Sequence, residues 1–175
     1  MGDSYPGGEA FFDARPNTAG VWVPLGPPRV DLPFQTLVDR VVPFAALIAK
    51  VQITLGPLAN DDAFEVKATF TVGAGSDGIA PLTENVNLQF GTFSTTIPGG
   101  SFTQDQDNEG RFKFEGVIAG VALEATITPL GTAGSFEFEA EGQAADLTGT
   151  ASPLTVRLNI GDDGGSTTLS TAEFE

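Results

Sequence analysis

The sequence contains neither cysteine nor histidine in its 175 residues. This absence excludes disulfide bonds, Cys-His and Ser-His-Asp nucleophilic systems, and zinc, haem or iron–sulfur centres held by thiolate or imidazole. Carboxylates are therefore the groups left for acid–base chemistry or for binding a metal. The lack of disulfides gives no positive evidence for an oxidising compartment.

Basic residues are scarce, with eight Lys and Arg against 23 Asp and Glu, for a formal net charge of −15. A surface of this sign repels phosphate backbones and anionic lipid, so nucleic acid is not expected as a partner. A cationic partner, a divalent metal or a general need for solubility would each fit the charge. Solubility is the simplest of these explanations.

Long apolar runs are also missing. The most apolar stretch, residues 41–51, contains Pro43 and is too short to span a bilayer, so no membrane insertion is expected. The first residues, MGDSYPGGEAFF, lack the basic region and apolar core of a signal peptide. If the protein is exported, we expect its signal to lie upstream of Met1.

What the chain does contain is the pattern of many short strands. Its 22 Gly and 12 Pro fall between apolar stretches, and apolar and polar residues alternate in segments 64–72, 136–141 and 156–160. Such alternation predicts half-buried strands in antiparallel sheets with one wet face. Ala119 and Gly120 are predicted to form a two-residue hairpin turn between strands at 111–118 and 121–128.

The clearest organisational signal is an internal repeat. Residues 64–91, FEVKATFTVGAGSDGIAPLTENVNLQFG, and residues 136–161, FEFEAEGQAADLTGTASPLTVRLNIG, both read strand, polar loop, Pro-Leu, strand, Gly. Each copy has one apolar face, so the copies and the central hairpin must pack together. We predict an all-β fold, an antiparallel β-sandwich or flattened barrel of about eight strands. Its predicted core is Phe64, Phe70, Leu88, Phe90, Phe112, Phe114, Leu123, Ile127, Phe136, Phe138, Leu158 and Ile160.

Residues 1–42 differ from the predicted sandwich at 46–175, because they are rich in proline and only weakly periodic. Short strands are predicted at 9–13, 21–23 and 31–38, and proline confines such strands to sheet edges. This segment alone has too little apolar area to fold.

Two resemblances extend this interpretation. Residues 46–172, above all GSFTQ, GRFKFEGVIAGVALEATITPLG and FEFEAEGQAADLTG, resemble modules of large exported bacterial proteins of unassigned function. Residues 5–38, with YPGGEAFF, WVPL and DLPFQT, resemble the closing strands of a jelly-roll module. The resemblances imply an extracellular or cell-surface location, a carbohydrate-binding or adhesive role, and a place at the C-terminal end of a longer protein. They supply no site residues.

Calcium is the first candidate ligand. Its candidate metal residues are Asp105, Asp107 and Glu109, which with Gly110 begin like an EF-hand loop. Positions seven, nine and twelve then hold Arg, Lys and Gly, so we favour a polar hairpin loop between strands at Phe102 and Phe112.

Other acidic residues have simpler explanations. Three loops are predicted to be turns, although loops gathered at one end of a sandwich could share an oxygen-rich site: Asn60-Asp61-Asp62, Ser76-Asp77-Gly78 and Asp162-Asp163-Gly164. Glu137, Glu139 and Glu141 lie on one strand face, where a glycosidase pair would be conceivable. We interpret them as a solvated stripe and predict no catalytic residues and no enzyme.

The single Tyr and single Trp, Tyr5 and Trp22, both lie in the proline-rich segment. They are candidates for stacking on a sugar ring, but we favour Trp22 filling a gap between that segment and the sandwich. The predicted function is a non-enzymatic structural or interaction module of an exported bacterial surface protein, in adhesion, display or domain spacing. The alternative is a glycan-binding module, either with or without a dependence on calcium. Another surface protein, or a second copy bound through unpaired N-terminal strands, are further candidate partners.

Overall fold

The computed structural model describes residues 11–13, 22–24, 41–105 and 110–174, with side chains from residue 41 onward. The chain divides into two compact units, Met1–Val38 and Asp39–Glu175. In the first unit, β1 (Phe11–Asp13) pairs antiparallel with β2 (Trp22–Pro24). The strand predicted at 31–38 lies outside the described residues.

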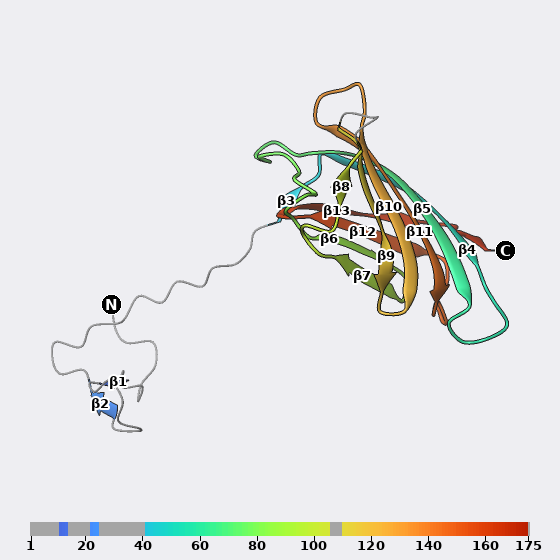
Figure 1. Ribbon diagram of the computed structural model, residues 1–175, viewed down its shortest axis with the longest axis horizontal. Helices are drawn as coiled ribbons and strands as arrows, with labels where there is room; N and C mark the ends of the chain where they lie inside the picture. The colour runs from blue at the N-terminus through green and yellow to red at the C-terminus, as the bar shows by residue number, and fades with distance from the viewer. Residues whose placement is uncertain (1–10, 14–21, 25–40, 106–109, 175) are drawn as a thin grey trace. The chain divides into compact units, whose positions relative to one another are not determined.

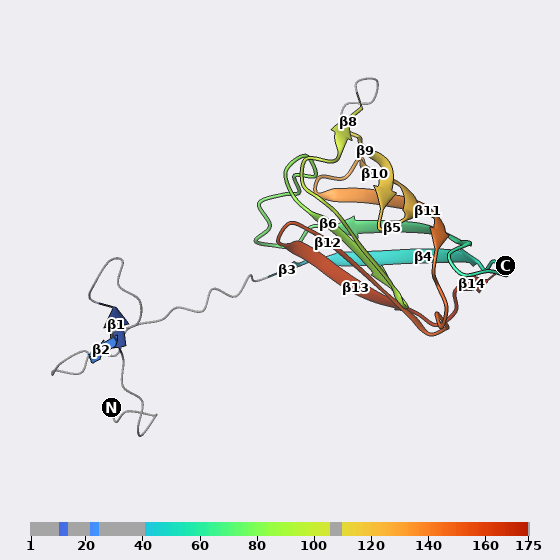
Figure 2. The same cartoon turned by 60° about the horizontal axis from the view of Figure 1, so that its bottom comes forward.

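The second unit is a sandwich of two sheets (Figures 1 and 2). The first sheet has the order β14 (Glu173–Phe174), β4 (Ala46–Thr54), β5 (Asp62–Thr71), β11 (Ser135–Ala145), β10 (Val121–Pro129), β9 (Phe112–Ile118) and β8 (Thr103–Gln104). The second has the order β3 (Val42–Pro43), β13 (Asp163–Leu169), β12 (Leu154–Ile160), β6 (Val86–Phe90) and β7 (Phe93–Ile97).

The predicted all-β sandwich is therefore confirmed. Nine of its described strands have five residues or more, close to the predicted eight, and three strands of two residues at sheet edges bring the total to twelve. Adjacent strands are antiparallel except for β3 with β13 and β14 with β4, which are parallel. Within the described part of the chain, no helix is long and apolar enough to cross a membrane.

The core lies between the two sheets, because alternate residues of each strand point inward. Ten of the twelve predicted core residues are buried, and Phe112 and Phe136 are half-buried. The ring of Phe64, from β5, lies 4.9 Å from that of Phe90, from β6, so aromatic contacts join the sheets. Burying each such ring contributes roughly 1.5–3 kcal/mol. The core also contains residues that the prediction omitted, among them Val51, Ile53, Ile97, Leu147, Leu154 and Val156.

The strand order gives the sandwich an approximate two-fold symmetry. Strands β4 to β7 form a hairpin in the first sheet, a crossover, and a hairpin in the second sheet, and strands β10 to β13 do the same. At the centre, β5 pairs with β11 in one sheet and β6 pairs with β12 in the other, both antiparallel. The topological repeat thus extends beyond the two segments seen in the sequence, to residues 46–97 and 121–169.

Tight turns close the equivalent hairpins of the two halves. Gly91 connects β6 to β7 and Gly161 connects β12 to β13, and their φ angles are 50° and 57°. A glycine with positive φ at the first of two loop positions is the pattern of a type II′ turn. The predicted turn at Ala119 and Gly120 is confirmed between β9 and β10, where both residues have positive φ.

Candidate functional site

The outer face of the seven-stranded sheet carries an ordered row of carboxylates. Cross-strand pairing places Glu65 of β5 opposite Glu141 of β11, Glu141 opposite Glu124 of β10, and Glu124 opposite Glu115 of β9. We call these four residues the glutamate row. Glu65 is half-buried and the other three are exposed, because strand alternation turns their neighbours toward the core.

Lysines neutralise only the ends of this row. The Nζ atom of Lys67 lies 2.7 Å from Oε1 of Glu65 and 3.6 Å from Oε1 of Glu139, and Nζ of Lys113 lies 3.2 Å from Oε2 of Glu115. The hydrogen bond to Glu65, and then its charge, raise the pKa of Lys67. Among the described residues, the two central members, Glu141 and Glu124, form no ion pair. Like charges placed directly opposite destabilise a sheet.

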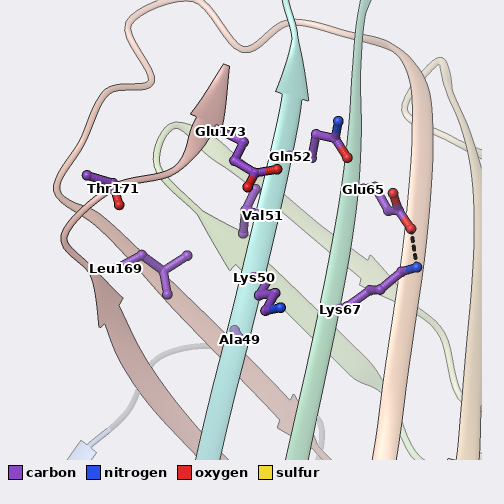
Figure 3. A pocket seen from close by; sticks show the side chains of 9 residues that line it. All are labelled: Ala49, Lys50, Val51, Gln52, Glu65, Lys67, Leu169, Thr171 and Glu173. Carbon is purple, nitrogen blue, oxygen red and sulfur yellow. Dashed lines mark ion pairs between the residues drawn. The ribbon is translucent and has the colours of Figure 1, made fainter. Parts of the chain in front are cut away.

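An open hollow of about 320 Å³ lies beside this row, where the C-terminal segment runs along β4 (Figure 3). Its walls carry both signs of charge, from Lys50 and Lys67 and from Glu65 and Glu173. Glu137, Glu139 and Glu141 of β11 belong to the same outer face, as the sequence predicts. Glu141 is exposed, whereas Glu137 and Glu139 are half-buried and so less solvated than predicted.

A second group of carboxylates lies at one end of the five-stranded sheet. Asp77 comes from the loop after β5, Asp162 from the β12–β13 turn, and Asp163 is the first residue of β13. One carboxylate oxygen from each lies within 4.8 Å of the other two. We call these three residues the aspartate cluster. The structure therefore brings together two of the three acidic loops that the sequence singled out.

Asp163 is the buried member of the aspartate cluster, with an exposed fraction of 0%, whereas Asp77 and Asp162 are exposed. Its Oδ2 accepts a hydrogen bond of 2.7 Å from Ser76 Oγ, which in turn accepts one of 3.0 Å from the Gly78 N–H. Its Oδ1 is buried and has no hydrogen-bond partner among the described residues. Burial raises the pKa of Asp163, the Ser76 hydrogen bond lowers it, and the negative charges of Asp162 and Asp77 raise it further.

The third acidic loop has a structural role. Asp62 is buried, and its two oxygens accept hydrogen bonds from the N–H groups of Gly56, at 2.8 Å, and Leu147, at 2.7 Å. Asp61 accepts a hydrogen bond of 2.9 Å from the Leu58 N–H. These carboxylates close the loop before β5, as expected for acidic residues in a turn.

Of the remaining sequence candidates, Asp105 lines an open hollow together with Glu124 and Glu141 of the glutamate row. Asp105 follows β8, and its N–H donates a hydrogen bond of 2.8 Å to the Arg111 carbonyl, which closes a hairpin loop. Asp107 and Glu109 lie outside the described residues, so calcium binding there stays a prediction. Tyr5 also lies outside them, and Trp22 is placed in β2 without a described side chain. Sugar stacking therefore also stays a prediction.

Sequence reasoning identified the acidic loops but not which of them meet. Asp77 and Asp163 are far apart in the chain, and their proximity depends on the path of the crossover between β5 and β6. The glutamate row was missed for a related reason. Alternation predicts that each Glu faces water, but only the register between strands aligns four of them.

Comparison with protein-family models, with curated proteins and with solved structures finds no match for this chain. What the structure itself defines is an all-β sandwich with two organised groups of carboxylates.

Proposed function

We propose that this chain is a non-enzymatic structural or interaction module of an exported bacterial surface protein, with adhesion, display or domain spacing as its role. The observation that supports this proposal is the glutamate row. It presents four aligned carboxylates on a regular, exposed sheet face, and Glu141 and Glu124 at its centre have no described cationic partner. Export and surface location are supported by the resemblance of residues 46–172 to modules of exported proteins.

The glutamate row lowers the stability of the folded sheet, and we take this cost as support for a role in recognition. Each pair of opposed like charges destabilises a sheet by about 0.2–1 kcal/mol. The glutamate row contains three such pairs, one on each strand boundary between β5 and β9. A basic partner would neutralise these charges on binding, and charge complementarity would both speed the encounter and select the partner. The partner class is therefore a protein surface or peptide rich in Lys and Arg.

The test uses the full chain with Glu124→Gln and Glu141→Gln combined, and immobilised basic peptides as the probe. We expect the double variant to bind at least about tenfold more weakly than the unchanged chain, with a smaller salt dependence, because two charges are lost. The matched control is Glu137→Gln, on the same face of β11 but outside the row.

Two results would contradict the proposal. Equal binding by the double variant and the unchanged chain would show that the glutamate row is not the interaction surface. Turnover of a polysaccharide or an ester that disappears when one specific carboxylate is changed would show that the protein is an enzyme.

A further inference from the structure

We propose that Asp77, Asp162 and Asp163 form a calcium-binding site that joins the loop after β5 to the β12–β13 turn. This proposal is independent of the glutamate row, which lies on the outer face of the other sheet. It rests on three observations from the described residues: the convergence of three carboxylates from two distant segments, the buried oxygen of Asp163 without a hydrogen-bond partner, and the lack of an ion pair between the cluster and a Lys or Arg.

The fold positions the site without requiring the ion to organise it. The β12–β13 turn fixes Asp162 and Asp163, and in both views the loop after β5 lies beside that turn (Figures 1 and 2). The loop after β5 also packs tightly against β3, because a Cβ atom on Gly73 would overlap the carbonyl oxygen of Pro43. The Ser76 hydroxyl then bonds Asp163 and so ties the loop to the turn.

A positive charge would stabilise the three carboxylates of the aspartate cluster. A buried carboxylate oxygen without a hydrogen bond is costly, since neither water nor protein compensates its charge. Asp77 and Asp162 add two further negative charges nearby. Among the described residues, no Lys or Arg forms an ion pair with any of the three. A bound divalent cation would compensate the three negative charges and so remove their mutual repulsion.

The donor set favours a hard divalent cation, and calcium is the one that we propose. Three carboxylates provide hard oxygen ligands, whereas zinc and copper sites use the imidazole and thiolate that this chain lacks. Calcium binds oxygens at about 2.3–2.6 Å, so two ligands on opposite sides of it are about 4.6–5.2 Å apart. The oxygens of the cluster, all within 4.8 Å of one another, can surround such an ion, with water completing its shell.

Titration calorimetry of the full chain with calcium chloride tests the proposal, with magnesium chloride as the competing ion. We expect one calcium per chain with a dissociation constant of about 10⁻⁴–10⁻³ M, as in extracellular calcium modules. At ten times that concentration, Tm should rise by about 3–6 °C over its value in EDTA.

Three variants locate the binding. Asp77→Asn and Asp162→Asn change exposed side chains, so the chain should fold, and each should weaken calcium binding by about tenfold or more. Asp163→Asn should raise Tm in EDTA, because it removes a buried charge, and should abolish the rise with calcium. If Asp163 had only a structural role, Asp163→Asn would not both raise Tm in EDTA and abolish the rise in Tm with calcium. The control is Asp146→Asn, which changes an exposed acid of the other crossover loop and should leave calcium binding intact.

The proposal is overturned if the chain shows no heat of binding and no change in Tm with millimolar calcium. It is also overturned if Asp77→Asn and Asp162→Asn bind calcium as tightly as the unchanged chain. Binding of magnesium with equal affinity would rule out a calcium site and leave only a general attraction of cations to an acidic surface.

Discussion

The two halves of the sandwich differ in how a buried aspartate holds the crossover loop of the opposite half. Asp62 accepts a hydrogen bond of 2.7 Å from the N–H of Leu147, in the crossover between β11 and β12. Asp163 accepts one of 2.7 Å from Ser76, in the crossover between β5 and β6. The second oxygen of Asp62 is bound by the Gly56 N–H, but the second oxygen of Asp163 has no partner.

This difference separates a structural carboxylate from a candidate ligand. Among the described residues, Asp62 and Asp163 are the two buried acidic side chains, and both tie one half of the repeat to the other. Asp62 completes its hydrogen bonds with two backbone donors and belongs to no acidic cluster of the described residues. Asp163 lies in the aspartate cluster, and one of its oxygens has no hydrogen-bond partner in the described part of the chain. Asp62 therefore shows that a carboxylate can be buried in this fold with a hydrogen-bond partner for each oxygen.

The largest expected effect is that of Asp62→Ala. This change leaves the buried N–H of Leu147 and the partly buried N–H of Gly56 without acceptors, at about 1–3 kcal/mol each. We expect the free energy of unfolding in urea to fall by about 2–6 kcal/mol. Asp163→Ala, measured in EDTA, should cost less than about 1 kcal/mol, because the lost Ser76 hydrogen bond is offset by relief of repulsion. Equal losses of unfolding free energy for Asp62→Ala and Asp163→Ala would contradict the proposed difference between the two aspartates.

A smaller difference is expected between the equivalent turns of the two halves. Alanine is strained at the positive φ of both Gly91 and Gly161, by about 1–2 kcal/mol. A Cβ atom at Gly91 would also overlap the buried side chain of Thr150. At Gly161 it would instead meet the end of the longer Glu84 side chain, whose carboxylate accepts a hydrogen bond of 2.7 Å from the Ala80 N–H. Gly91→Ala should therefore destabilise the protein by about 1 kcal/mol more than Gly161→Ala in thermal unfolding. The reverse order would show that the turns do not differ as described.

The pH dependence of stability should sharpen the assignment of Asp163. Its pKa in the folded state is raised above the ordinary value of 3.8, chiefly by burial, so its contribution is fully present below that value. It is lost as the pH rises through the folded-state pKa. In EDTA, the stability of the unchanged chain relative to Asp163→Asn should therefore fall as the pH rises from acid toward neutral. Calcium should reverse this trend, and a flat difference in both buffers would contradict the assignment.

The smallest effect is expected on the exposed outer face. Glu124→Gln combined with Glu141→Gln removes the repulsion of all three opposed pairs in the glutamate row. Because exposed charges repel at the low end of about 0.2–1 kcal/mol per pair, the chain should gain roughly 0.6–1 kcal/mol in denaturant unfolding at low salt. High salt should abolish the gain, because exposed charges are screened. A loss of stability at low salt would show that these two carboxylates have partners that the cross-strand arrangement does not reveal.

The fold could be predicted largely because its long strands alternate. Residues 64–72 show the period directly, and the structure buries Phe64, Val66, Ala68 and Phe70 on one face of β5. The edge strands β3 and β14 could not be predicted, since two paired residues carry no period. Ile53 and Leu147 were missed as core residues because one lies in an apolar stretch without clear alternation and the other in a loop.

The candidate site was less accessible to sequence reasoning. The sequence correctly indicated turns at Asp61 and at Asp162, because Asp and Gly favour such backbone geometry. It could not show that Asp77 reaches Asp163 while Asp62 reaches Leu147, because these contacts depend on crossovers between two sheets. Long-range contacts of this kind have no signature in local composition.

The parallel edge strands determine how the sandwich would carry a mechanical load. The chain enters through β3, which runs parallel to β13, and leaves through β14, which runs parallel to β4. If β3 and β14 were pulled in opposite directions, the force would act along these two strands. It would therefore load their hydrogen bonds to β13 and β4 in shear. Hydrogen bonds loaded in shear share the force, whereas bonds that unzip break one at a time.

The β3 end of this load path meets the aspartate cluster. Val42 pairs with Asp163, and its N–H donates a hydrogen bond of 2.6 Å to the Asp162 carbonyl. Tension on the entering chain is therefore delivered to the turn that holds two of the three cluster carboxylates. A calcium ion bound there would cross-link the β12–β13 turn to the loop after β5 at the point where the force is applied.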